Sequence, residues 1–297
     1  MNYTDFLDTK NIEYRLNEPM CRHTTFRIGG EASYYVLPKT EEEFISAFES
    51  AYESEMPVFV CGNLSNIVFA DEGFDGAVID TRMMNSLLVE GNLILAQAGA
   101  TLTSVSRLAL ERGLTGLEFS YGIPGTVGGG VFMNAGAYGG QLSDVTVKVR
   151  AYDIASKRIV ELNREECEFS YRHSIFSEGN MLILSAVFSL ESGERESIRI
   201  LMNERMQARR DMQPLELPSA GSVFKRPEGY FVGKMMDDLG LKGLRVGGIE
   251  VSRKHGGFMV NVDNGTCADL IALISTVKER VYAAYGVTLE CEIGFVR

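Results

Sequence analysis

The spacing of apolar residues predicts two amphipathic helices in the first half of the chain. At the start of residues 40–54, Thr40 and Glu43 make a capping box. The inner face of this helix, at helical spacing, consists of Phe44, Phe48, Ala51 and Tyr52. Residues 101–112 form the second predicted helix, which Gly113 ends.

Three more helices are predicted in the second half. Residues 194–212 form a charged helix, and residues 231–239 form a short one. Residues 266–285 show the clearest pattern in the chain, with Thr266 as a cap and Gly286 as a stop. The apolar face of this last helix consists of Leu270, Leu273, Ile274, Val277, Val281 and Tyr285.

Short apolar runs predict strands between these helices. Residues 57–61 read PVFVC and lead into a polar turn, residues 62–66, ahead of a second apolar run. A strand followed by a tight polar turn is where an α/β protein places a ligand-binding loop. Residues 145–152, 158–162 and 182–190 are predicted to be antiparallel strands.

The last residues, VTLECEIGFV, alternate and predict one more strand. One face would hold Val287, Leu289, Cys291, Ile293 and Phe295, and the other Glu290, Glu292 and Gly294. Paired carboxylates on a strand usually face solvent. A carboxylate in a pocket would instead be protonated more readily and would suit proton transfer.

Composition narrows the class of protein. The chain has 297 residues, 45% of them hydrophobic, which suits about two or three domains. A net charge of −11 disfavours binding to nucleic acid or to a membrane surface. The polar N-terminus shows no signal peptide, the five cysteines no CxxC pair and the three histidines no HExxH motif. We therefore expect a cytoplasmic globular protein without a metal.

Residues 120–140 read SYGIPGTVGGGVFMNAGAYGG and contain eight glycines. A run this dense should leave amide N–H groups uncovered, and nests of such groups bind phosphate. No Lys, Arg or His occurs from Gly113 to Val147, so a phosphate here would be held by main-chain dipoles. The segment fits neither a P-loop nor a Rossmann fingerprint. The alternative is a flexible linker, but its interleaved apolar residues favour burial.

Three weaker signals lie outside the glycine-rich segment. From Ser222 to Gly257, seven Lys or Arg residues stand against four acids, which indicates a site for an anion or an ordinary solvated face. Ser222 lacks the G-x-S-x-G context of a hydrolase nucleophile, and alone it suggests a turn serine. Arg172, in SYRH, suggests a surface or ion-pair residue when taken alone.

Together and in this order, the motifs resemble the UDP-N-acetylenolpyruvoylglucosamine reductase family of flavoenzymes, from about Thr24 to the C-terminus. The resemblance rests on TFRIGG at residues 25–30, CGNLSN at 61–66, YGIPGTVGG at 121–129 and MNAGAYG at 133–139. The flavin positions that it implies are Arg27, Gly29, Gly62, Asn63, Leu64, Ser65, Asn66, Gly122, Ile123, Pro124, Gly125, Thr126, Gly128, Gly129, Asn134, Ala135, Gly136 and Ala137.

The resemblance also implies three catalytic residues. Arg172 stands in the family's Tyr-Arg motif and Ser222 in its Ala-Gly-Ser-x-Phe-Lys motif. Glu292 matches the family's glutamate better than Glu290, because it is the acid followed by the final apolar residues. The implied substrate-binding positions are Lys225, Lys242 and His255, with Lys242 at a substrate phosphate.

The sequence departs from the family pattern at two places. Leu64 stands in the pyrophosphate turn where glycine is common. Only a short turn separates Phe176 from Met181, where type I members carry an insertion with a tyrosine that closes over substrate. The chain therefore resembles the shorter, type II form.

The implied fold is α+β, with a two-lobed FAD-binding region of the PCMH (vanillyl-alcohol-oxidase-like) type and a C-terminal α/β substrate domain. The expected domains are residues 1–54 with 291–297, residues 55–191 and residues 192–290. The implied cofactors are non-covalent FAD and NADPH, and the implied partner is a UDP-sugar that shares one cleft with NADPH in a monomer.

The implied reaction belongs to peptidoglycan precursor synthesis. Hydride from reduced flavin reaches C3 of the enolpyruvyl group, and the product is the lactyl ether of UDP-N-acetylmuramate. Arg172 and a protonated Glu292 would stabilise the enolate, and Ser222 would protonate C2. The alternatives are another flavin oxidase of the same architecture, with oxygen as acceptor, and a flavin- or nucleotide-binding scaffold without turnover.

Overall fold

The computed structural model describes residues 2–297, which form two compact units. The first unit comprises Met1–Arg15, Tyr34–Asn63 and Gly76–Ala208, and the second Leu16–Ser33, Leu64–Asp75 and Arg209–Arg297. Both contain helices and strands, so the predicted α+β class is confirmed. These units divide the chain at other positions than the three predicted domains, and that domain division stays a prediction.

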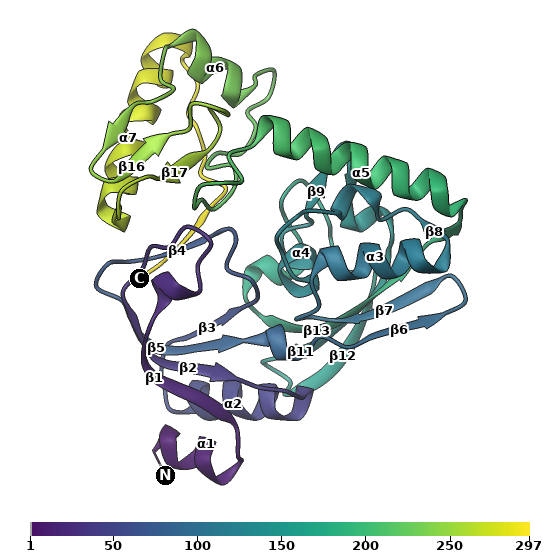
Figure 1. Cartoon of the computed structure of the whole chain (residues 1–297). Helices are drawn as coiled ribbons and strands as arrows, with labels where there is room; N and C mark the ends of the chain where they lie inside the picture. Colours follow the sequence, from purple (N-terminus) through teal and green to yellow (C-terminus); the bar gives the residue numbers. More distant parts are fainter. Residues whose placement is uncertain (1) are drawn as a thin grey trace. The chain divides into compact units, whose positions relative to one another are not determined.

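An antiparallel five-stranded sheet, with strand order β12-β11-β13-β7-β6, organises the larger part of the first unit. Its strands are β6 (Leu87–Glu90), β7 (Leu93–Gln97), β11 (Thr146–Asp153), β12 (Arg158–Asn163) and β13 (Met181–Ser189). The last three confirm the predicted antiparallel strands. Helices α3 (Leu102–Arg112) and α4 (Val127–Phe132) lie on one face of the sheet (Figure 1).

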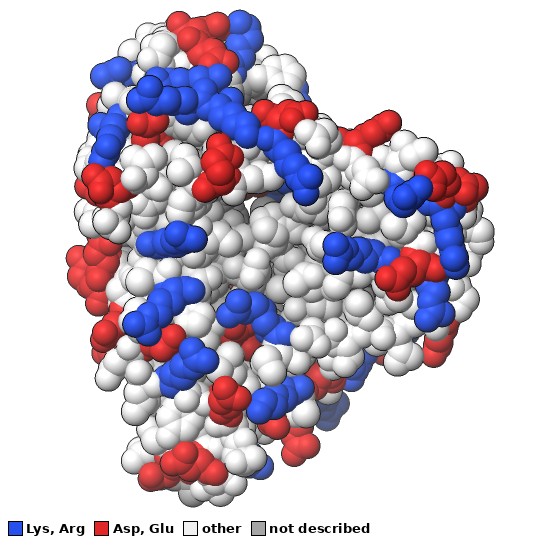
Figure 2. Space-filling model, in the orientation of Figure 1, with Lys and Arg blue, Asp and Glu red and all other residues white. Residues whose placement is uncertain are grey.

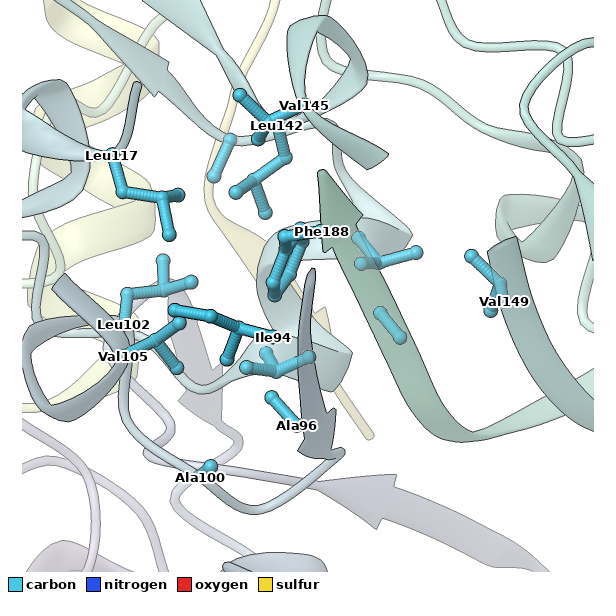
Figure 3. Packing of buried hydrophobic residues seen from close by; sticks show 14 of the residues in the cluster. Ile94, Ala96, Ala100, Leu102, Val105, Leu117, Leu142, Val145, Val149 and Phe188 are labelled. Atoms are coloured by element: carbon cyan, nitrogen blue, oxygen red, sulfur yellow. The ribbon is translucent and has the colours of Figure 1, made fainter. Parts of the chain in front are cut away.

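Apolar side chains from the sheet and from these two helices form one core. Phe188 and Ile94 of the sheet meet Leu102 and Val105 of α3, all with exposure of 1% or less (Figure 3). Helix α3 ends as predicted, because Gly113 takes a left-handed φ of 67°. The short pairs β8 (Leu114–Thr115) with β14 (Glu191–Ser192), and β9 (Gly136–Ala137) with β10 (Gly140–Gln141), complete the strands around this core.

A second sheet has the order β1-β2-β5-β3. Its strands are β1 (Glu13–Pro19), β2 (Glu31–Leu37), β3 (Val58–Cys61) and β5 (Phe74–Asp80), and it is joined by α1 (Tyr3–Thr9) and α2 (Glu41–Glu53). Strands β3 and β5 are parallel, with Cys61 opposite Asp80. Their carboxyl ends therefore meet at one edge, where the predicted ligand-binding turn begins.

Helix α2 confirms the predicted helix and corrects its inner face. Thr40 accepts from the Glu43 amide as expected, but the Glu43 carboxylate bonds the Lys39 amide, so only half of the capping box forms. Phe44, Phe48 and Ala51 are buried. Tyr52 is 57% exposed and stacks on the Phe48 ring, because Ala47 takes the inner position.

The second unit packs its helices against a small antiparallel sheet. Strands β15 (Arg245–Val246), β16 (Ile249–Val251) and β17 (Met259–Asn261) lie beside α7 (Cys267–Tyr285), and α6 (Val232–Asp238) completes this region (Figure 1). Thr266 caps α7 and Gly286 ends it, as predicted.

Helix α5 (Arg195–Met212), most of which belongs to the first unit, confirms the predicted charged helix.

The predicted C-terminal strand is shorter than expected. Only β18 (Gly294–Val296) forms a ladder, parallel to β4 (Ile67–Phe69). Upstream the chain stays extended but makes isolated bonds, because Lys225 donates its amide to Glu290 and Glu292 donates its amide to Val223. Leu289 and Ile293, both predicted on the apolar face, are nevertheless buried.

Candidate functional site

The first unit brings two of the predicted flavin segments into contact. Gly62 and Asn63 follow β3, and Asn63 Nδ2 donates to the Pro124 carbonyl at 2.6 Å. A Cβ atom at Gly62 would overlap Thr126 Oγ1 and lie 2.9 Å from its Cγ2. Glycine is therefore required at Gly62 by this close approach of the two loops.

The amides at the start of α4 correct the expectation of an uncovered nest. Val127 and Gly128 donate to the carbonyls of Ala100 and Ala98, both at 2.8 Å. Thr126 Oγ1 accepts from Gly129, and the Thr126 carbonyl accepts from Gly130. The first two amides anchor the segment to Ala98 and Ala100, and the other two bond within the segment, so all four already have a protein acceptor and do not form the uncovered nest that glycine density suggested.

Other glycines of the segment leave room for a ligand. A Cβ atom at Gly129 would meet only Thr126 Oγ1, at 3.6 Å, and one at Gly125 would make only ordinary contacts. Gly129 lies in α4 and is exposed. Neither residue is required by internal packing, so the bare main chain at Gly125 and Gly129 fits a cofactor lying against it.

A buried polar network at the end of β5 was missed by the sequence analysis. Asp80 is fully buried and forms an ion pair with Arg82 Nη2 at 2.6 Å, and the Tyr35 hydroxyl donates to the same carboxylate. Thr81 Oγ1 donates to the Cys61 carbonyl at 2.9 Å. The network thus fixes Cys61, the residue before Gly62, and it places the Arg82 cation just after β5. The sequence signal that could have predicted this network is GAVIDTR at residues 76–82, where Asp80 and Arg82 follow an apolar run.

The other glycine motif forms a tight hairpin. Gly136 and Ala137 pair with β10, and the turn residues Tyr138 and Gly139 have φ of 54° and 82°, as a type I′ turn requires. The Tyr138 hydroxyl donates to the Arg205 carbonyl of α5 at 2.9 Å. The Gly136 carbonyl, on the opposite strand end, accepts from Arg172 Nη2 at 3.2 Å.

Arg172 lies in a two-residue turn closed by hydrogen bonds between Ser170 and His173. Its φ is 56°, which is uncommon for a side chain of this size, and its guanidinium lies 5.0 Å from the centre of the Tyr171 ring. The structure therefore connects the predicted catalytic arginine to the predicted flavin segment within one unit.

Asn134, predicted to bind the cofactor, uses its side chain on the protein. It is 1% exposed and has a left-handed φ of 44°. Its Nδ2 donates to the Ser170 carbonyl at 3.0 Å, and its Oδ1 accepts from the Ser143 amide at 3.0 Å. Nearby Ala135 is buried and Ile123 packs against the core, while Gly122 takes a positive φ of 84°.

The second unit brings Ser222 and Glu292 onto neighbouring extended segments. Glu292 donates its amide to the Val223 carbonyl at 2.8 Å, and Phe224 pairs with Cys291. The Ser222 hydroxyl makes no hydrogen bond with any residue in the described range 2–297. Its proton is therefore available to a bound molecule.

Asn66 of the predicted pyrophosphate turn holds the main chain around Glu292. Its Nδ2 donates to the Glu292 carbonyl at 3.0 Å, and its own carbonyl accepts from the Gly294 amide at 2.9 Å. A flavin-turn residue and the predicted catalytic acid are thus directly connected. The neighbouring Ser65 is half-buried.

Three flavin positions of the second unit have backbones that favour glycine. Leu64 has φ of 48° and is 4% exposed, so the turn demands the left-handed conformation that glycine takes without strain. Arg27 is exposed with φ of 57°. Gly29 has φ of 128°, and a Cβ atom there would lie 2.7 Å from Phe69 Cβ.

The two C-terminal carboxylates differ in surroundings. Glu290 has a side chain 72% exposed and pairs with Lys225 Nζ at 3.4 Å, whereas Glu292 is half-buried. Of the two acids that share a face by sequence, Glu290 is therefore the solvent-facing member.

The predicted substrate residues Lys242 and His255 lie near each other. Lys242 Nζ pairs with Asp237 at 2.7 Å, and the charges of both act on the His255 ring. Burial is the main cause that lowers the pKa of His255. Its Nδ1 accepts from the Gly257 amide at 3.1 Å, which assigns the proton of the neutral ring to Nε2. A neutral His255 is therefore a hydrogen-bond donor through Nε2.

The basic stretch from Ser222 to Gly257 is largely neutralised. Figure 2 shows acidic and basic side chains interspersed on the face of the molecule that it displays. The pairs are Lys225–Glu290, Lys234–Asp238, Lys242–Asp237, Arg245–Asp263, Arg253–Glu250 and Lys254–Glu216. An anionic ligand would compete with these carboxylates, so charge excess alone does not make a site here.

Residues 2–297 show neither of two further features, a metal-binding cluster and a membrane-spanning helix. Within that range, no three His, Cys, Asp or Glu side chains gather in a way that could hold a metal ion. None of the helices described there has the length and apolar character needed to cross a membrane.

Comparison with known proteins agrees with this geometry. Residues 213–296 match the C-terminal domain family of UDP-N-acetylenolpyruvoylglucosamine reductase, and residues 32–163 match an FAD binding domain family. The chain is 44% identical over 298 residues to the UDP-N-acetylenolpyruvoylglucosamine reductase of Caldicellulosiruptor bescii, covering 100% of this chain and 95% of that protein. It is 46% identical over 277 residues to the enzyme of that name from Geobacillus thermodenitrificans, covering 93% and 91%.

Solved structures give the same result. The UDP-N-acetylenolpyruvylglucosamine reductase of Thermus caldophilus superposes with a TM-score of 0.82 at 32% identity, covering 96% of this chain and 99% of that one. A berberine-bridge-enzyme-like protein of Physcomitrella patens, 14% identical with a TM-score of 0.52, shares the fold over 65% of this chain and 45% of that one. The predicted PCMH-type FAD-binding region with a C-terminal domain is therefore confirmed. The chain belongs to the UDP-N-acetylenolpyruvoylglucosamine reductase family.

Proposed function

We propose that this protein is an FAD-dependent reductase that uses NADPH to reduce the enolpyruvyl group of UDP-N-acetylglucosamine enolpyruvate. The product would be UDP-N-acetylmuramate, a precursor of peptidoglycan. The observation that carries the proposal is the 2.8 Å bond from the Glu292 amide to the Val223 carbonyl, because it pairs the main chain of the predicted acid with the residue that follows the predicted proton donor Ser222. Family membership supports the same reaction.

The residues present fit a bound FAD. The bare main chain at Gly125 and Gly129 and the turn at Gly62–Asn63, all in the first unit, would lie against it. Ser65 and Asn66 remain predicted flavin positions of the second unit. When bound, the flavin supplies hydride to the enolpyruvyl carbon, and NADPH restores that hydride. Arg82 is held by its ion pair with Asp80, which lies opposite Cys61, the residue that precedes this turn.

Arg172 would bind the substrate carboxylate. Its planar fork presents several donors to two oxygens at once, and these bonds strengthen as negative charge moves onto the carboxylate during hydride addition. The bond to the Gly136 carbonyl connects this guanidinium to the predicted flavin segment.

Ser222 would donate the second hydrogen, as a proton, to C2 of the substrate. A hydroxyl is a weak acid in water, but the enolate carbon is strongly basic and the geometry is fixed. Because the hydroxyl makes no hydrogen bond within residues 2–297, no protein contact must be broken first. A protonated Glu292 would stabilise the same enolate.

Lys225, Lys242 and His255 are proposed to bind the substrate, with Lys242 at a phosphate. Lys242 would exchange its Asp237 partner for a phosphate oxygen, and His255 would donate through Nε2. The proposal includes NADPH and the sugar nucleotide using one site in turn, in a cytoplasmic monomer.

The experiment that tests this function follows the product. Purified protein, NADPH and UDP-N-acetylglucosamine enolpyruvate should give stoichiometric NADPH oxidation and a product heavier by two hydrogens, with one deuterium from D₂O at C2. Oxygen consumption with a sugar and no NADPH would favour the oxidase alternative. Flavin binding without either reaction would favour the scaffold alternative.

A further inference from the structure

We propose that Asn134 is a positioning residue for Arg172, acting through the turn that carries the arginine. This role rests on the proposed function and concerns the step in which substrate accepts hydride. It differs from the cofactor contact that the family motif suggests for Asn134.

The turn that carries Arg172 has a conformation that its own residue types do not favour. It has two central residues, Tyr171 and Arg172, and is closed by the Ser170 amide to the His173 carbonyl at 3.1 Å and the reverse bond at 3.3 Å. Arg172 takes φ of 56°, a region that L-residues with long side chains occupy only when their surroundings impose it. Some contact outside the turn must therefore hold it.

Asn134 makes that contact. Its Nδ2 donates to the carbonyl of Ser170, the first residue of the turn, at 3.0 Å. The same amide group is fixed at its other atom, because Oδ1 accepts from the Ser143 amide at 3.0 Å. A longer bond of 3.3 Å to Gln141 Oε1 uses the second Nδ2 hydrogen.

The bonds of the Asn134 side chain to Ser170 and Ser143 form a clamp on the turn, and this clamp needs a carboxamide. One end must donate to a carbonyl and the other must accept from an amide, within a side chain that is 1% exposed. Aspartate has the same shape but, when ionised, only accepts. It would place a charged oxygen against the Ser170 carbonyl oxygen.

The clamp connects the turn to the segment that Arg172 itself touches. Asn134 lies two residues before Gly136, whose carbonyl accepts from Arg172 Nη2 at 3.2 Å. The turn and the glycine hairpin are therefore joined at both the main chain and the guanidinium. Ser174 Oγ adds a bond to the Phe132 carbonyl at 2.7 Å, so loss of Asn134 would shift the turn without detaching it.

The test uses two substitutions and a matched control in the full-length, FAD-loaded protein. Asn134→Gly removes the clamp while keeping a residue that tolerates φ of 44°. Asn134→Asp keeps the acceptor and removes the donor. Gln141→Ala removes the weaker partner of the same amide, together with the 3.3 Å bond from Gln141 Nε2 to Asp144.

Anaerobic stopped-flow separates the two half-reactions. Because a misplacement of about 1 Å costs on the order of 10²-fold in rate, we expect flavin reoxidation by UDP-N-acetylglucosamine enolpyruvate to slow at least about tenfold in both Asn134 variants. Flavin reduction by NADPH should stay within about twofold of wild type, as should both steps in Gln141→Ala. Equal slowing of the two half-reactions, or wild-type reoxidation in both variants, would overturn the proposal.

A double-mutant cycle distinguishes a positioning role of Asn134 from a merely structural one. In an Arg172→Lys background, Asn134→Gly should change reoxidation by less than about twofold, because the group that it positions is already gone. Independent, multiplying effects would refute the assignment even if one variant folds poorly. If the wild-type flavin is not reoxidised by this substrate at all, the proposed function fails instead, so the two failures are distinguishable.

Discussion

Arg172 Nη2 donates to the main-chain carbonyl of Gly136 at 3.2 Å, across a sequence separation of 36 residues. The guanidinium also lies 5.0 Å from the Tyr171 ring centre. These contacts join the predicted catalytic arginine to the glycine hairpin and to its own turn.

Replacing this arginine by lysine should show that the fork matters as well as the charge. Arg172→Lys keeps one positive charge but loses the paired donors, so flavin reoxidation by the enolpyruvyl substrate should fall about 10²-fold. Reduction by NADPH should be unaffected. Rapid-mixing absorbance of the flavin measures both, and a lysine variant with wild-type reoxidation would contradict the role.

Removing the Ser222 hydroxyl should slow proton transfer to C2 of the substrate. Ser222→Ala should retain FAD and its reduction by NADPH, while reoxidation by substrate slows on the order of 10²-fold or more. The side chain makes no hydrogen bond within residues 2–297, so folding should be preserved. Ser177→Ala, which removes a hydroxyl bonded to the Phe132 carbonyl, is a suitable control for loss of a serine.

Gly62 tests the contact between the flavin turn and α4. The Cβ atom of Gly62→Ala would overlap Thr126 Oγ1, which also caps Gly129, so relief of the overlap would cost that cap. We expect the free energy of unfolding to fall by about 1–3 kcal/mol and FAD to bind more weakly. Thermal denaturation and flavin content after gel filtration measure these effects.

Gly233→Ala is the matched control for that substitution. Gly233 lies within α6, and its Cβ atom would come no closer than 3.9 Å to His255 Cε1. Alanine favours helix over glycine by about 0.5–1 kcal/mol, so this variant should be unchanged or more stable. Equal destabilisation of both variants would show that the Gly62 effect is not specific to the contact.

His255 should make stability depend on acid pH. Burial lowers its pKa in the folded state, so the unfolded chain binds more protons as pH falls through about 6.5. This contribution to stability is therefore complete above that pH and is lost on acidification. His255→Asn should show a smaller drop in Tm between about pH 7.5 and pH 5.5 than wild type. An identical drop in both proteins would argue against this linkage.

The helices were predictable because their signals are local. Thr266, Gly286 and the apolar spacing between them define α7 without any distant contact. Tyr52 was placed wrongly because helical spacing identifies a face but not its edge, where a long side chain can stack outside the core. The C-terminal strand was overestimated because alternation reports burial, whereas a ladder needs a continuous partner.

The sequence motifs identified candidate site residues, but not the contacts that hold those residues in place. Glycine density suggested free amides, yet Val127 and Gly128 donate to carbonyls of residues about 30 positions earlier, a pairing that no local pattern contains. Asn134 matched a flavin motif, but its partners Ser143 and Ser170 become visible only when three segments are folded together. Long-range polar contacts of this kind are absent from single-sequence patterns.

The most direct test of the account is a single turnover without oxygen. Flavin in the purified protein should bleach on addition of one equivalent of NADPH, and its oxidised absorbance should return fully when UDP-N-acetylglucosamine enolpyruvate is added. A flavin that stays reduced with this substrate and recovers only when oxygen is admitted would contradict the proposed reaction.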